Sequence, residues 1–272
     1  MKIMKWLAIG LLPFTLVGCL EGNKNTDQLC QSNPGLRCEQ LNMNDGQCRV
    51  ARTDLIWHRF EVQKQPTEIN KIKEFELVTA YKKCLELAAQ IETIDQSKLQ
   101  ERRFTSLMHS IEESERIVSE LSQSDTPETL YFLWSQTGDT NARRSFLQLE
   151  GTDALNTAEM QYALATFYTT RDHVKTLKLL NNALTLSSNS NANTEIFKSM
   201  ASINHSLGNM EEAYVWAMVA KDFNVPIASE SELAVLYHFE KPKYKQLNKD
   251  ADKIVEAIED GVYSPAVVKS YE

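Results

Sequence analysis

The sequence predicts an all-α protein in which helical hairpins stack as a short solenoid. Apolar residues recur at three- and four-residue steps over most of the chain, and no segment alternates convincingly like a strand. The C-terminal half also repeats with a period of 34 to 37 residues. We divide the chain into a signal peptide (1–18), a polar cysteine-containing tether (19–50), a helical hairpin region (51–124) and a repeat region (125–272).

The N-terminus has the pattern of a bacterial lipoprotein signal. Lys2 and Lys5 precede a mostly apolar run at residues 6–17, which is too short to span a bilayer. Gly18 and Cys19 follow, whereas an ordinary secretory signal is cut after an A-x-A-like site. An ordinary signal with a chance cysteine is the alternative. We expect cleavage before Cys19 and lipidation of Cys19, which would anchor the protein through several acyl chains.

Composition and the residue after Cys19 indicate a cellular location and exclude some classes of binding partner. Leu20 stands where an aspartate commonly retains lipoproteins at the inner membrane, so the sorting rule for such proteins implies the outer membrane, facing the periplasm. The formal net charge of −8 argues against nucleic acid or anionic lipid headgroups as partners. No later apolar run approaches the ~20 residues of a spanning helix.

Four cysteines remain besides Cys19, namely Cys30, Cys38, Cys48 and Cys84. An even set in an oxidising compartment predicts two disulfides, for which three pairings are possible. We favour Cys30 with Cys38 and Cys48 with Cys84, because a short loop closes at low entropic cost and Cys84 needs a partner from the tether. The spacings lack the close pairs that zinc sites prefer, so we expect no metal.

The hairpin region carries two long amphipathic patterns. Thr53 or Asp54 can cap a short helix that Pro66 ends, and Thr67 begins the first long helix. Its apolar stripe is Ile69, Ile72, Phe75, Leu77, Tyr81, Leu85, Ala88 and Ile91. The second long helix carries Leu99, Phe104, Leu107, Met108, Ile111, Ile117, Val118 and Leu121, with Glu112, Glu113, Glu115 and Arg116 mostly on its solvated side. Two such helices should pair as an antiparallel hairpin.

The repeat region aligns on small residues at fixed spacing. Its anchors are Ala142, Thr176 and Ala213, with a weaker fourth unit at Asp250. Phe146, Leu180, Ala217 and Ile254 follow four positions later, and Leu149, Ala183, Ala220 and Ala257 follow seven positions later. This spacing is typical of tetratricopeptide-like repeats, in which small side chains let two helices approach closely. Ser229 with Glu232 predicts a capping box. A generic helical bundle is the alternative, because some units exceed 34 residues and a long loop lies at 187–193.

Six segments also carry a resemblance to known proteins. They are 42–48 (NMNDGQC), 52–59 (RTDLIWHR), 134–139 (WSQTGD), 162–168 (YALATFY), 213–218 (AYVWAM) and 256–261 (EAIEDG). On these segments the chain resembles a bacterial lipoprotein family catalogued as a domain of unknown function. The resemblance implies the lipoprotein class and no assigned activity.

No local motif indicates catalysis or a cofactor. The chain lacks a glycine-rich phosphate loop, an H-E-x-x-H pair, a G-x-S-x-G elbow and an S-x-x-K motif, and its five histidines lie far apart. We therefore assign no catalytic residue, no metal ligand and no cofactor, and we do not expect an enzyme.

Recognition of another protein is the function that the repeat pattern favours. In tetratricopeptide-like hairpins the first helix lines the concave groove, and aligning Ala165 with Ala201 directs a polar set toward it. This set is Tyr162, Thr166, Thr169, Lys198, Ser202 and His205. Such residues suit a peptide or helix of another envelope protein, although they could simply face solvent. We expect a membrane-anchored periplasmic scaffold or adaptor. The alternatives are an enzyme acting on peptidoglycan or envelope glycans and a small-ligand binding lipoprotein.

Overall fold

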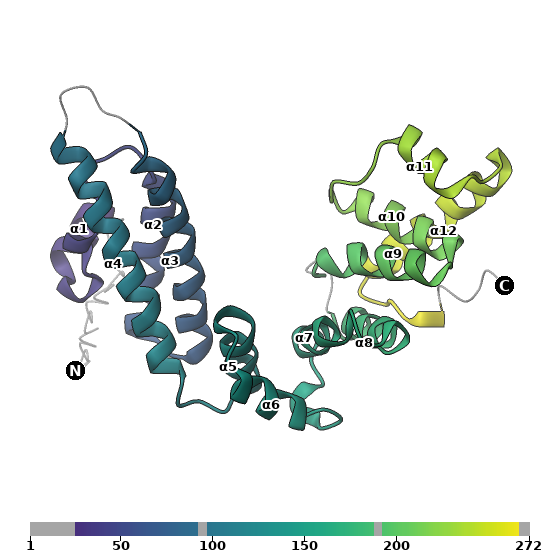
Figure 1. Ribbon diagram of the computed structural model, residues 1–272, viewed down its shortest axis with the longest axis horizontal. Coiled ribbons are helices and arrows are strands. Elements are labelled where there is room, and N and C mark those ends of the chain that lie inside the picture. The colour runs from purple at the N-terminus through teal and green to yellow at the C-terminus, as the bar shows by residue number, and fades with distance from the viewer. Residues whose placement is uncertain (1–24, 92–96, 188–191, 267–272) are drawn as a thin grey trace, which may run out of the picture. The chain divides into compact units, whose positions relative to one another are not determined.

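A computed structural model describes residues 25–91, 97–187 and 192–266 (Figure 1). Every regular element within these ranges is helical, which confirms the all-α prediction. Contacts divide the chain into two compact units, residues 1–117 (unit 1) and 118–272 (unit 2). The predicted signal peptide and Cys19 lie outside the described residues. Among the described helices, none combines the length and apolar character that crossing a membrane requires.

Unit 1 is built around three helices that lie alongside one another. They are α2 (Arg49–Lys64), α3 (Glu68–Ala88) and α4 (Ser97–Leu121), the last of which runs a few residues into unit 2 (Figure 1). Thr67 caps α3 as predicted, because its side chain accepts a hydrogen bond from the Asn70 amide. The expected cap of the short helix was wrong. This helix, α2, begins at Arg49, and Cys48 precedes it with φ +57° and no side-chain cap.

Residues 25–48, which precede these helices, fold against them. They form α1 (Thr26–Ser32) and two short 3-10 turns, Pro34–Leu36 and Cys38–Gln40, and they bury Leu29, Leu36 and Leu41. Disulfides join Cys30 to Cys38 and Cys48 to Cys84, with Cα atoms 5.9 and 5.7 Å apart. The favoured pairing is therefore confirmed, and the second disulfide fastens this segment to α3.

The buried faces of α3 and α4 differ from the predicted stripes. In α3 the buried residues are Glu74, Val78, Tyr81, Leu85 and Ala88, whereas Ile69 and Ile91 are exposed. In α4 Phe104 and Met108 are exposed, while a mainly polar face is buried. That face is Arg103, Ser106, Ser110, Glu113, Ser114, Ile117 and Leu121. Placing Glu113 on the solvated side was therefore wrong, because its carboxylate is paired inside the unit.

Unit 2 consists of consecutive helix pairs. The helices are α5 (Pro127–Phe132), which continues into a π-helical turn at Leu133–Thr137, α6 (Thr140–Gln148), α7 (Ala158–Tyr168), α8 (His173–Leu186), α9 (Glu195–Leu207), α10 (Met210–Asp222), α11 (Glu230–Tyr237) and α12 (Lys241–Glu259). A short 3-10 turn, Asp153–Leu155, precedes α7. Packing joins α5 to α6, α7 to α8 and α9 to α10, and α12 packs mainly on α10.

The aligned positions of the repeat region lie in the core of unit 2, except for Leu149, which is half-buried. All four anchors are buried, as are the four residues that follow them by four positions. Gly138 and Gly208 end their helices with φ +74° and +82°, the left-handed conformation that glycine adopts without a steric penalty. Ser229 and Glu232 form the predicted capping box at the start of α11. The periodic pattern thus identified core positions and helix pairs.

Candidate functional site

The candidate binding surface surrounds α11 in unit 2. A depression of about 320 Å³ lies between α9, α10 and α11. Lys198, Ser202 and His205 line it from α9, and Leu233, Leu236 and Tyr237 line it from α11. Three of the six predicted groove residues therefore lie together, on the first helix of their pair.

Two further depressions adjoin the same short helix. One of about 530 Å³ is lined by α10, α11 and α12, including Tyr214, Met218, Lys221 and Tyr244. The other is open and largely apolar, and its lining is Ala228, Ser231, Glu232, Val235 and Leu236. All three share Ala228, so they form one continuous surface, which we call the α11 surface.

The packing of α11 explains why this surface is apolar. Leu233 and Tyr237, one turn apart, are buried and attach the helix to the rest of unit 2. The Tyr237 ring lies 5.4 Å from that of Tyr214 and 6.2 Å from that of His205, and burial raises the pKa of Tyr237. Val235 and Leu236, on the same helix, are 70% and 46% exposed. A short helix thus presents large apolar side chains to solvent.

The other three predicted groove residues do not line the α11 surface. The Thr166 hydroxyl donates to the Ala163 carbonyl at 2.7 Å, and the Thr169 hydroxyl donates to the Ala165 carbonyl at 3.0 Å. Tyr162 is half-buried, and burial raises its pKa. The hydroxyls of Thr166 and Thr169 thus bond to carbonyls of α7 itself. The predicted set therefore divides into three residues at α7 and three residues on α9.

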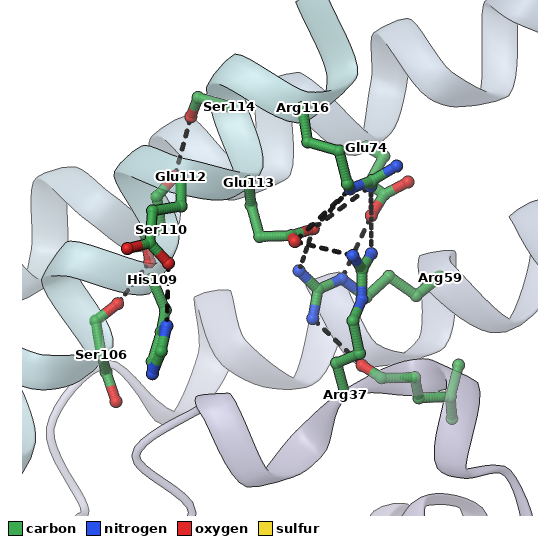
Figure 2. Close-up of polar contacts among 11 residues, drawn as sticks. Arg37, Arg59, Glu74, Ser106, His109, Ser110, Glu112, Glu113, Ser114 and Arg116 are labelled. Carbon is green, nitrogen blue, oxygen red and sulfur yellow. Dashed lines mark hydrogen bonds and ion pairs between the residues drawn. The ribbon is translucent and has the colours of Figure 1, made fainter. Parts of the chain in front are cut away.

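A second polar constellation, a buried ion network, lies inside unit 1. Figure 2 shows three guanidinium groups around two carboxylates, those of Glu74 and Glu113. Arg59, only 3% exposed, donates to Glu74 at 3.1 Å, to Glu113 at 3.1 Å and to the Leu36 carbonyl at 3.0 Å. Burial lowers the pKa of Arg59, and the adjacent carboxylates oppose that shift. Arg37 and Arg116 reach the same carboxylates from the rim (Figure 2).

A second buried network holds the loop that precedes α2. Arg103 of α4 donates to both Asp45 carboxylate oxygens, at 2.5 and 3.2 Å, and to the Ala88 carbonyl at 2.9 Å. Arg52 donates to the backbone carbonyls of Asn42 and Asp45. The hydrogen bond from Arg103 lowers the pKa of Asp45, although burial opposes the shift. This carboxylate is therefore held ionised against a partner.

Both networks connect the N-terminal segment to the helices of unit 1. Their carboxylates are paired with guanidinium groups, and the groups that they join come from the N-terminal segment, α2, α3 and α4. They fasten the disulfide-bonded segment to the helices at several points. In the portions of the chain that the structure describes, no three His, Cys, Asp or Glu side chains are grouped so as to hold a metal ion.

The sequence analysis missed these networks, because Glu113 and Arg103 lie in charge-rich stretches that resemble a solvated face. One signal was available. Arg59 follows the apolar Leu55 by four residues, so the two share a helix face. An arginine on such a face requires a buried partner.

Fold and site together define a disulfide-bonded, all-α protein of paired helical hairpins that exposes an apolar helix. The chain belongs to the family described as "Protein of unknown function (DUF2989)", which matches residues 16–218. The matched range contains Cys19, the four disulfide cysteines and most of α10, and α11 and α12 follow it. No curated protein matches the chain, and no solved structure matches it either.

Proposed function

We propose that the protein is a lipid-anchored envelope lipoprotein that serves as a protein-binding scaffold or adaptor. Cys19 would carry the lipid, and Leu20 would direct the protein to the outer membrane, facing the periplasm. Two disulfides among the remaining cysteines suit an oxidising compartment. The anchor would confine the protein near the bilayer and raise its effective concentration toward partners in the same envelope.

The repeat region would be a short tetratricopeptide-like solenoid. Three consecutive helix pairs and the burial of the aligned small residues support this interpretation. The last unit departs from a regular stack, because α12 packs mainly on α10. We attribute the α11 surface to this departure, since no helix among the described residues covers Val235 and Leu236 as a regular neighbouring unit would.

One observation carries the proposal. Val235 and Leu236 are exposed beside a depression that three predicted groove residues line. Exposed apolar side chains gathered around a hollow mark binding surfaces, because burying them against a partner releases ordered water. The mixture of apolar and polar lining suits a helix or peptide of another envelope protein.

In-cell photocrosslinking tests the proposal. A photoreactive residue at Ser202 should capture one recurrent envelope protein, and adding Leu236→Asp should abolish that capture while leaving the helical content of the protein unchanged. A photoreactive residue at the exposed Asn156, also in unit 2, is the matched control. Equal capture from Asn156, or no capture from Ser202, would contradict the groove assignment.

The membrane anchor has its own test. Cys19→Ala should remove fatty-acid labelling, leave the signal uncleaved by the lipoprotein peptidase and release the protein from outer-membrane fractions. Normal labelling of this variant would end the lipoprotein proposal.

A further inference from the structure

We infer that the α11 surface binds an acidic amphipathic helix. This inference rests on the proposed function and specifies the chemistry of the partner. Three features of the surface carry it, namely its apolar side chains, the sign of the charge around them and the absence of a strand edge in the described residues.

The apolar part supplies a continuous contact area. Ala228 lines all three depressions and Val235 lines one, while three residues line two each, namely Ile227, Leu233 and Leu236. Burial of these exposed aliphatic side chains against a partner is favourable in proportion to the apolar area removed from water. A partner with apolar residues on one face would therefore gain most of its affinity here.

Two lysines and one carboxylate line this area, which therefore has an excess of one positive charge, although the whole chain carries −8. Lys198 and Lys221 are the lysines in the lining of the depressions, and Glu232 is the carboxylate. Glu232 keeps its charge, but hydrogen bonds from the Ser229 amide at 2.8 Å and the Ser229 hydroxyl at 2.7 Å hold its carboxylate at the start of α11. A partner with carboxylates flanking its apolar face would complement the two lysines.

Lys198 can exchange its present ion-pair partner, Glu195, for a carboxylate of the bound helix. Lys198 lies 2.5 Å from Glu195, and the two side chains are 47% and 54% exposed. Such an exposed pair is weak in water, so a partner carboxylate in a less hydrated interface can compete with Glu195.

The helical structure around the α11 surface favours a partner that is itself a helix. Every regular element of the described residues is a helix, so no strand edge in them can accept an extended peptide by strand addition. A helix that lies beside α11 can place residues i, i+3 or i+4, and i+7 on the apolar area and its carboxylates toward the lysines.

Two labelled synthetic peptides test the inference against the full chain in detergent. Both are amphipathic helices with the same leucine stripe, and one carries glutamate where the other carries lysine. Fluorescence anisotropy should give roughly tenfold tighter binding of the glutamate peptide at low salt, and the difference should shrink as salt is added. Equal binding, or tighter binding of the lysine peptide, would overturn the inference.

Matched variants locate the interaction. Val235→Asp should weaken glutamate-peptide binding by about tenfold or more, because a charge then enters the apolar area. Val174→Asp in α8 is the control, because Val174 is 71% exposed and lies outside the three depressions. Lys198→Glu combined with Lys221→Glu should reverse the peptide preference, whereas Lys178→Glu should not. Equal effects of the two valine substitutions would overturn the location.

Two further outcomes separate this inference from the proposed function. Capture of a partner from Ser202, without any preference for the glutamate peptide, would refute the acidic helix and leave the scaffold standing. No capture and no binding of either peptide would refute both. Sedimentation that shows self-association lost in Val235→Asp would assign the surface to a second copy of the chain and overturn the inference.

Discussion

Unit 1 and unit 2 are both assembled from helices packed around apolar side chains, but unit 1 adds buried ion networks to its interior. Unit 1 buries charged side chains, which include Arg59 and Glu74 from α2 and α3, and it adds two disulfides. Unit 2 buries aliphatic and aromatic side chains such as Phe146, Phe197 and Trp216. A charged interior tolerates little alteration, because removal of one partner leaves another charge buried and unpaired. An apolar interior responds mainly to lost volume.

The largest expected effect is in unit 1. Arg59→Met should lower the free energy of unfolding of unit 1 by about 3–5 kcal/mol, because Glu74 and Glu113 then lose their most buried partner. Urea unfolding monitored by circular dichroism measures the change. Arg144→Met in α6 is the control, because Arg144 is exposed and its replacement should cost less than about 0.5 kcal/mol. Similar losses for both variants would contradict the difference between the units.

In unit 2, Leu180→Ala should cost about 2–5 kcal/mol, because Leu180 is fully buried and its removal leaves a cavity. Leu180→Met conserves volume and should cost less than about 1.5 kcal/mol. Urea unfolding again gives both values. An equal cost for the two variants would mean that volume does not govern this interior.

Removal of Cys48–Cys84 should have the next largest effect. Replacing both cysteines by serine should cost about 2–4 kcal/mol, and the corresponding change at Cys30–Cys38 should cost less. The sequence separations are 36 and 8, and closing a longer loop restricts the unfolded chain more strongly. Thermal unfolding of the two double variants measures the order. The opposite order would show that native contacts outweigh loop closure.

Lowering the pH should destabilise unit 1 through protonation of Asp45. The folded-state pKa of Asp45 is lowered, so its contribution to stability is present above the unfolded pKa of about 3.9 and is lost as pH falls through the lowered value. Urea midpoints measured from neutral pH to about pH 3 should fall less steeply in an Asp45→Asn and Arg103→Met double variant than in the unaltered protein. Identical slopes would remove Asp45 from the acid response.

The sequence predicted the regular features of the fold because they depend on local patterns. Each of these patterns can be recognised within a short stretch of sequence. They are the helical periodicity, the Thr67 cap, the Ser229–Glu232 capping box and the spacing of the aligned small residues. The disulfide pairing followed from loop length. In contrast, the buried face of α4 depends on partners more than 50 residues away, as for Arg59 with Glu113 and Arg103 with Asp45.

The candidate site was predictable only in part. Aligning Ala201 with the first-helix positions identified Lys198, Ser202 and His205, because a helix face follows directly from periodicity. The α11 side of the same depression was not identified, since the apolar Val235 and Leu236 could equally belong to a buried helix. Their exposure follows from the packing of Leu233 and Tyr237, which sequence periodicity does not specify.

The disulfide between Cys48 and Cys84 also has a mechanical consequence. If the N-terminus is held by lipid and a partner pulls on unit 2, the chain between these cysteines cannot be drawn out while the bond persists. The 36-residue separation corresponds to roughly 120–130 Å of extended chain at about 3.3–3.6 Å per residue. The disulfide itself would therefore carry the tension between membrane and partner, and the α2–α3 segment inside the closed loop would be shielded from the load.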